Sequence, residues 1–282
     1  MIRSVKVLVG SLTCVLALAC GCATTPETPD ASPMRDEARA REAREALARF
    51  FSGWTRNPSP ARIAYGMSLL DTIARTNGEE NCRPANMMPA IGFFAHVFNE
   101  TAAQADEWAR LALKLESASA REVIALALYL SGAPSGYEAF VTLREALETP
   151  PGGTPLMRAR EIPPQPALDS LIEGELAAPA QLDYCWGAYL ATGDVAFALR
   201  VFDVAMRESD EKIDGKPAAD TTMSLARLSL LPFMADDARV HEAVNARLRI
   251  APDELIADFC AGLDERARRQ ILDDDLFRRT AK

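Results

Sequence analysis

Residues 181 to 207 constrain the fold of this chain more than any other stretch. They read QLDYCWGAYLATGDVAFALRVFDVAMR, with apolar side chains at helical spacing on both sides of Thr192-Gly193-Asp194. A glycine between two such segments marks the place where the chain turns. We therefore predict two amphipathic helices that fold back on one another at Gly193.

The composition extends this prediction to the whole chain. Its 282 residues are 49% hydrophobic and 25% charged, which argues against disorder over most of the length. Alanine and leucine dominate, whereas the β-forming residues valine, isoleucine, tyrosine and tryptophan are sparse. We therefore expect a nearly all-α protein.

The charge pattern bears on the class of partner. The net charge is −9, and residues of both signs are scattered along the chain. Proteins that neutralise phosphates carry a basic stripe, which this sequence lacks. Nucleic acid is therefore not an expected partner.

The first 22 residues have the three zones of an export signal. Arg3 and Lys6 precede an apolar run over residues 7–19, and small residues with cysteine follow. We predict that residues 1–22 form this signal and take no part in the fold. An uncleaved membrane helix over residues 5–23 is the alternative, because that stretch is nearly long enough to span a bilayer.

The run LALACGCATTP resembles the lipobox of bacterial lipoproteins, in which the signal is cut before a cysteine that is then acylated. Cys20 and Cys22 are both candidates for this cysteine, and Cys20 is preferred. Residues 23–32 are rich in threonine and proline, as in a flexible tether. No aspartate follows either cysteine, so the resemblance implies an anchor in the outer membrane and a domain that faces the periplasm.

Apolar periodicity and breaker residues predict the order of helices along the chain. Before the hairpin at residues 181–207, the expected helices cover residues 33–54, 63–74, 87–99, 101–115, 118–130 and 137–147. After it, they cover residues 221–233, 235–250 and 253–263, and a terminal helix ends near residue 277. Residues 148–167 contain six prolines and two glycines. We therefore predict an N-terminal helical half (33–149), a proline-rich connector (150–166) and a C-terminal helical half (167–282).

The cysteines and histidines give no pattern typical of a metal site. Cys185 and Cys260 lie within apolar helical patterns, which predicts burial, whereas Cys82 lies in a charged loop and is expected to be the most exposed cysteine. His96 is expected to bond a backbone carbonyl inside a buried helix. No CxxC or HxxxH spacing is present, so neither a metal nor another cofactor is expected.

The hairpin at residues 181–207 resembles a tetratricopeptide repeat. That motif needs a tyrosine in its first helix, an alanine nine residues later, an aromatic residue four later and an alanine three beyond. Tyr189, Ala198, Phe202 and Ala205 have this spacing, and Gly193 lies at the turn. The resemblance implies stacked helical hairpins and a surface that binds a protein or peptide.

A weaker second copy of the motif lies earlier in the chain, on Ala127, Ala139, Leu143, Ala146 and Pro151. Ala139 and Ala198 are 59 residues apart, whereas adjacent tetratricopeptide units are 34 apart. The prediction is therefore an irregular α-solenoid of stacked helical hairpins, tetratricopeptide-like but without a regular tandem array.

Trp186 breaks the motif, because it stands where a glycine or alanine belongs. An oversized side chain there could lean outward, which makes Tyr184 and Trp186 candidate partner-binding residues. The alternative is that Trp186 fills a looser core.

No catalytic motif accompanies these features. Ser209 and Lys212 have Ser-x-x-Lys spacing but lie in a charged loop, without the companion elements of penicillin-recognising enzymes. The sequence favours a non-enzymatic, membrane-anchored periplasmic lipoprotein that acts as a protein- or peptide-binding scaffold. A helical envelope enzyme, or a carrier of small ligands acting on cell-wall material, is the alternative.

Overall fold

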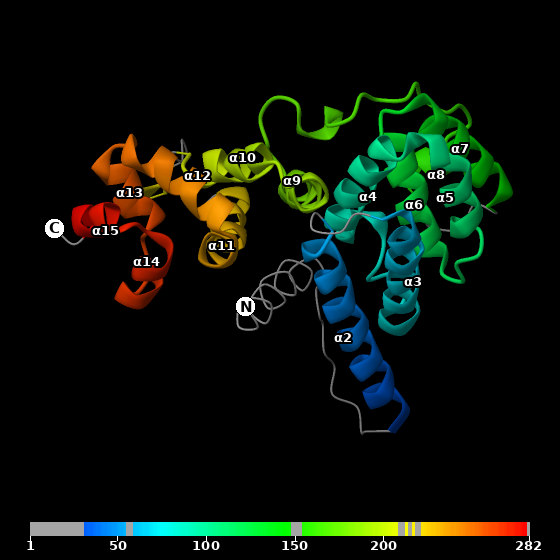
Figure 1. Ribbon diagram of the computed structural model, residues 1–282, viewed down its shortest axis with the longest axis horizontal. Helices are drawn as coiled ribbons and strands as arrows, with labels where there is room; N and C mark the ends of the chain where they lie inside the picture. Colours follow the sequence, from blue (N-terminus) through cyan, green and yellow to red (C-terminus); the bar gives the residue numbers. More distant parts are fainter. Residues whose placement is uncertain are drawn as a thin grey trace.

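The computed structural model describes residues 31–54, 59–147, 154–207, 212–213, 216–217 and 221–280, with the backbone alone for residues 31–36 and for the two short strands (Figure 1). Within these ranges the protein is all-α, as predicted, apart from a ribbon in which β1 (Lys212–Ile213) pairs antiparallel with β2 (Lys216–Pro217). No helix in this part of the chain is long and apolar enough to cross a membrane. The predicted signal, Cys20, Cys22 and Ser209 lie outside the described residues.

The first half consists of helices that pair mostly with their neighbours in sequence. They are α2 (Ala31–Ser52), α3 (Pro60–Asn77), α4 (Met88–Glu100), α5 (Ala105–Ala112), α6 (Ala118–Leu130) and α7 (Pro134–Ala146), with short 3-10 turns η1 (Pro84–Asn86) and η2 (Ala102–Gln104). Helix α2 packs on α3, α6 on α7, and α4 on α6. The expected order of helices along the chain is therefore present in this half, whereas α4 packs on α6, and α5 on α7, rather than each on the next helix in sequence.

Helix α4 is the centre of the core, as its apolar sequence predicted. Every residue from position 89 to 98 is buried. Phe93 packs against Phe51, with ring centroids 4.4 Å apart, and meets Trp54 edge-on at 5.7 Å. Aromatic pairs of this kind add to the stability that apolar burial gives. They fix the C-terminal end of α2 to α4.

The second half continues toward the C-terminus and ends in the short helices α13, α14 and α15 (Figure 1). Its elements are α8 (Pro155–Arg158), the turn η3 (Ser170–Ile172), α9 (Pro179–Thr192), α10 (Val195–Ala205), α11 (Thr221–Asp236), α12 (Ala238–Arg249), α13 (Asp253–Phe259), α14 (Glu265–Ile271) and α15 (Asp274–Thr280). Helix α10 packs on α9, α11 and α12.

The α9–α10 turn follows the predicted hairpin closely. Gly193 has a φ of 73°, the left-handed conformation that glycine adopts without steric cost. Asp194 then caps α10, because its carboxylate accepts a hydrogen bond of 2.9 Å from the Ala196 N–H. The helix boundary at this turn is thus set by two adjacent residues.

The two halves meet where α9 crosses α4, the most extensive helix–helix contact in the described chain. A Cβ atom on Gly187 would lie 2.1 Å from the Pro89 carbonyl oxygen, and one on Gly92 would lie 2.5 Å from the Tyr184 carbonyl oxygen. Only glycine allows the two backbones to approach this closely. Helix α9 therefore packs on the first half as tightly as on its own hairpin partner.

Several predicted helix boundaries were wrong for local reasons. The stretch 101–115 is divided into η2 and α5, and the Thr101 hydroxyl, which donates to the Val97 carbonyl, ends the preceding helix. Helix α7 begins at Pro134, three residues early, because proline suits the first helical position. Helix α11 continues past Pro232, whose missing N–H leaves only the carbonyl of the exposed Leu228 without its helical partner.

Candidate functional site

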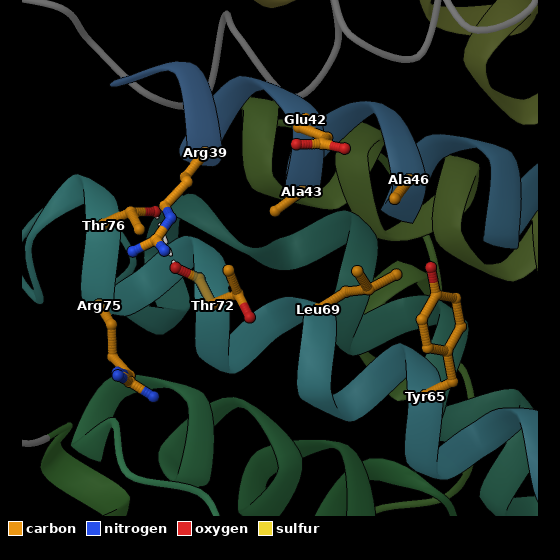
Figure 2. Close-up of a pocket in the computed structure, with 9 residues that line it drawn as sticks. All are labelled: Arg39, Glu42, Ala43, Ala46, Tyr65, Leu69, Thr72, Arg75 and Thr76. Carbon is orange, nitrogen blue, oxygen red and sulfur yellow. Dashed lines mark hydrogen bonds between the residues drawn. The ribbon is translucent and has the colours of Figure 1, made fainter. Parts of the chain in front are cut away.

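A groove runs between α2 and α3, the first two helices of the folded chain (Figure 2). Its cavity volume is about 480 Å³. The lining residues come from these two helices alone: Arg39, Glu42, Ala43, Ala46, Tyr65, Leu69, Thr72, Arg75 and Thr76.

Helical periodicity explains why these positions share one groove. Residues 39, 43 and 46 recur at spacings of four and three on α2, and residues 65, 69, 72 and 76 do so on α3. Because the helices are antiparallel, Arg39 lies near Thr76 at one end and Ala46 lies near Tyr65 at the other (Figure 2). The groove therefore follows the length of the helical hairpin.

The size of the side chains decides where the hairpin is open. Toward the end of α2, Phe50 packs so closely on α3 that a Cβ atom on Gly66 would lie 2.6 Å from its ring. One and two turns earlier in the chain, Ala46 and Ala43 present only methyl groups. These methyl groups leave the space that forms the groove.

The two ends of the groove differ in chemistry. Figure 2 shows Arg39 reaching from α2 toward Thr72 and Thr76 of α3, which makes that end polar. Arg75 points away from Arg39 and forms an ion pair with Glu116, with an N–O distance of 2.8 Å. At the other end the Tyr65 ring is 53% exposed beside Leu69. A ligand would thus meet a guanidinium group at one end and an aromatic ring at the other.

The lining suits binding by contact and hydrogen bonding. The Thr72 hydroxyl donates 2.9 Å to the Ser68 carbonyl, and the Thr76 hydroxyl donates 2.7 Å to the Thr72 carbonyl. Both hydroxyl oxygens keep the capacity to accept a hydrogen bond. Among the described residues of the lining, Glu42 is the single carboxylate.

The expectation that Trp186 leans outward into a groove is wrong. Its side chain has no exposed surface, and its ring stacks on Phe233 with centroids 4.0 Å apart. The indole N–H donates a hydrogen bond of 3.0 Å to the Ser229 Oγ atom. The large ring fills the space between α9 and α11, so Trp186 is a core residue.

Tyr184, the other predicted partner-binding residue, is also buried. It is 1% exposed, and its backbone abuts Gly92 at the crossing of α4 and α9. Burial raises the pKa of its phenol, with a further contribution from the nearby Asp169 carboxylate. The structure places both Tyr184 and Trp186 in the core, away from the α2–α3 groove.

The cysteine predictions hold for two residues and fail for the third. Cys185 and Cys260 are buried, as expected, and burial raises the pKa of their thiols to about 12 and about 11. Cys82, predicted to be exposed, is only 2% exposed because its loop packs against the core. Cys185 and Cys260 are free thiols. Protonated, buried thiols are poor nucleophiles.

Each histidine has an aspartate partner that lies far away in sequence. The His96 Nδ1–H donates 2.9 Å to the Gly92 carbonyl, as predicted, and the Nε2 atom lies 3.0 Å from the Asp169 Oδ1 atom. His241 Nε2 lies 3.2 Å from Asp273 Oδ1. In the part of the chain that the structure describes, no group of three or more His, Cys, Asp or Glu residues is placed to hold a metal ion.

Sequence reasoning missed both the groove and the Asp169 contact. A signal for the groove was present, because Ala43 and Ala46 interrupt the apolar stripe of α2 while Thr72 and Thr76 interrupt that of α3. No signal linked His96 with Asp169, which is 73 positions away. That pairing depends on how the connector crosses α4.

Comparison of the chain with protein-family models, with curated proteins and with solved structures finds no significant match.

Proposed function

We propose that this protein is a lipid-anchored periplasmic scaffold that binds an extended segment of a partner protein in the α2–α3 groove. The observation that carries the proposal is the groove itself, an open cavity of about 480 Å³ between two helices. It has a cationic end and an aromatic end, and a peptide can engage both at once.

The sequence before α2 supports the anchor. The lipobox-like run places the acylated residue at Cys20 or Cys22, and α2 begins at Ala31. The intervening residues, eight after Cys22 or ten after Cys20, span at most about 36 Å when fully extended. The groove would therefore lie close to the membrane surface, where it can meet other envelope proteins.

Packing of the second hairpin supports a tetratricopeptide-like, irregular α-solenoid. Tyr189, Ala198, Phe202 and Ala205 are all buried. The small alanines allow α10 to approach α9, and Phe202 extends to Phe259 of α13, with ring centroids 6.0 Å apart. These are the roles that the repeat assigns to such positions.

The groove favours a particular peptide chemistry. Arg39 is exposed and matches a carboxylate, which a guanidinium group binds well. Tyr65 and Leu69 offer apolar contact to a neighbouring aliphatic or aromatic side chain. We therefore expect a segment in which an acidic residue lies a few positions from an apolar one.

Disabling the groove without unfolding the protein tests this proposal. Ala46→Trp would fill the cavity from a half-buried position, and Leu228→Trp on α11 adds the same ring at an exposed site away from it. A photocrosslinker at Thr72 should capture a defined envelope protein in the parent chain and in the Leu228 variant, but not in the Ala46 variant. Capture that is equal in all three would contradict the proposal.

The anchor is tested separately by mass spectrometry of the mature N-terminus. We expect an acylated cysteine at position 20 or 22. An intact Met1 in the mature protein would contradict lipoprotein processing.

A carrier of small ligands, or an envelope enzyme that acts on one, is the second candidate. The cavity volume favours it, because it lies within the range of about 300–1,000 Å³ that small-molecule pockets occupy. Native mass spectrometry of the protein from envelopes would reveal a bound small molecule. Its loss in the Ala46→Trp variant, without any crosslinked protein, would favour this function over the scaffold.

A further inference from the structure

The connector between the two halves carries three prolines close together, Pro163, Pro164 and Pro166. A proline fixes its own φ at about −65° and keeps the residue before it out of the helical conformation. In the described chain, residues 160–166 take part in no backbone–backbone hydrogen bond. Both properties are those of a polyproline II helix, which is extended and has no internal hydrogen bonds. Residues 162–166 therefore form a short polyproline II segment.

The exposure of the side chains follows the three-residue turn of such a helix. Ile162 and Leu168 pack against the core, and Gln165, midway between them, is half-buried. These three residues form one edge of the segment, which faces the protein. One residue in three thus attaches the segment to the core along its whole length.

Hydrogen bonds to α6 and to the start of α7 also fix the segment in place. The Gln165 side-chain amide donates to the carbonyls of Tyr129, at 3.3 Å, and Ala133, at 3.0 Å. The Tyr129 hydroxyl donates 3.0 Å to the Pro164 carbonyl. A segment held in this way has already lost its conformational freedom. A partner that binds it does not have to order it first, which favours affinity.

A second edge of the segment faces solvent. It consists of Arg160, Pro163 and Pro166, which follow one another at spacings of three. Arg160 and Pro163 are exposed, Pro166 is half-exposed, and Arg160 forms no ion pair with another described residue. At about 3.1 Å per residue, successive members of this outer edge lie about 9 Å apart.

The outer edge matches one kind of protein surface. Grooves lined by aromatic side chains bind polyproline II segments whose prolines are three positions apart. The guanidinium group of Arg160, one turn before Pro163, pairs well with a carboxylate at the end of such a groove. A purely anionic surface would use the charge of Arg160 alone and would leave the two prolines without a role.

We propose that Arg160, Pro163 and Pro166 form a preorganised polyproline ligand, and that its partner is a protein domain with an aromatic-lined groove that ends in a carboxylate. The ligand is held by α6 and α7, whereas the α2–α3 groove is formed by other helices. Figure 1 shows the connector running outside the helices between α8 and α9. The chain can thus hold two partners at separate surfaces.

Titration of the full chain with a purified SH3 domain tests the ligand, because SH3 domains bind polyproline II segments in an aromatic-lined groove. The domain is one selected for Arg-x-x-Pro-x-x-Pro peptides, and isothermal titration calorimetry gives its Kd. Pro163→Ala should weaken binding at least about tenfold, because it empties one slot of the groove. Pro164→Ala is the matched control, since Pro164 is exposed on a different edge, and it should stay within about threefold of the parent chain.

The charge is tested in the same way. Arg160→Glu should weaken binding at least about tenfold. Arg158→Glu makes the same change at an exposed arginine outside the outer edge, and it should stay within about threefold of the parent chain. No binding by the parent chain, or equal losses in the Pro163 and Pro164 variants or in the Arg160 and Arg158 variants, would overturn the ligand.

A synthetic peptide of residues 157–169 tests the preorganisation. We expect the full chain to bind the SH3 domain at least about threefold more tightly than the peptide does, because the fold has already ordered the segment. A peptide that binds as tightly as the chain, or more tightly, would show that the fold does not present the outer edge and would overturn the ligand.

A photocrosslinker at Glu161, an exposed residue beside the outer edge, tests for the natural partner. We expect it to capture an envelope protein in the parent chain and in Ala46→Trp, which fills only the α2–α3 groove. Excess SH3 domain should block this capture, and Pro163→Ala should abolish it. No capture, or capture that persists in Pro163→Ala, would contradict a partner of this kind.

Discussion

Two helix pairs in this molecule use small residues at their interface, with opposite results. Where α4 crosses α9, Gly92 and Gly187 bring the two backbones into direct contact. Where α2 runs along α3, Ala43 and Ala46 leave a cavity of about 480 Å³. The two interfaces differ in the residues that flank their small residues.

At the α4–α9 crossing the residues next to the two glycines, Phe93 and Trp186, are large and buried, whereas the groove is flanked by Arg39 and Tyr65, which are exposed. A small residue closes an interface only where its neighbours hold the helices together. Elsewhere it produces a hollow.

The largest effect on stability is expected where volume is added at the α4–α9 crossing. Gly187→Val places atoms within the space occupied by the Pro89 carbonyl and the Phe93 N–H. Because the backbone of α4 cannot move without disturbing the core, we expect a loss of about 5 kcal/mol in the free energy of unfolding. Chemical denaturation followed by circular dichroism measures it. Stability equal to that of the parent chain would mean that α4 and α9 do not meet at this point.

Trp186→Ala tests the other face of α9. Removing the ring leaves a cavity beside Phe233 and takes away the hydrogen bond that the Ser229 hydroxyl accepts, so we expect a loss of about 3–4 kcal/mol. The melting temperature of the purified protein, without any partner, is the measurement. A change in partner binding with no loss of melting temperature would restore the groove assignment that the structure opposes.

Asp183 gives the α4–α9 crossing a pH dependence. It lies one turn before Gly187 on α9, and burial raises the pKa of its carboxyl group from 3.8 to about 7. The folded state then holds a proton that the unfolded state releases, so this contribution to stability is full below about pH 4 and is lost as the pH rises through 7.

The measurement is the free energy of unfolding at pH 5 and pH 8 for the parent chain and for Asp183→Asn. We expect the parent chain to lose about 2 kcal/mol more than the variant over this interval. Equal losses in the two proteins would show that the Asp183 carboxyl group is well solvated in the fold.

The smallest effect on stability is expected where volume is added at the open groove. Ala46→Leu extends into the cavity, so the free energy of unfolding should change by no more than about 0.5 kcal/mol. The same change should weaken partner binding at least about tenfold, because the added carbons occupy the space of the ligand. A loss of more than 2 kcal/mol would indicate that α2 and α3 pack more closely than the cavity implies.

The sequence predicted most of the helices but fewer of the contacts between them. The local sequence pattern was sufficient to predict the Gly193 turn, the capped hairpin and the buried helix α4. Each of these features depends on residues within a few positions of one another. The roles of Trp186 and Cys82 were misread, because burial depends on which elements cover a side chain from elsewhere in the chain. The groove was missed for the same reason.

Helical propensity, apolar periodicity and breaker residues by themselves determined that this chain forms an all-α protein with helices in a set order. The tertiary structure alone decided that Gly92 meets Gly187, that His96 meets Asp169 and that α2 and α3 leave a cavity between them. The physical reason is the distance along the sequence over which each interaction acts. Propensity and capping act within one or two helical turns, whereas close backbone contacts and side-chain contacts such as His96 with Asp169 form between residues that only the complete fold brings together.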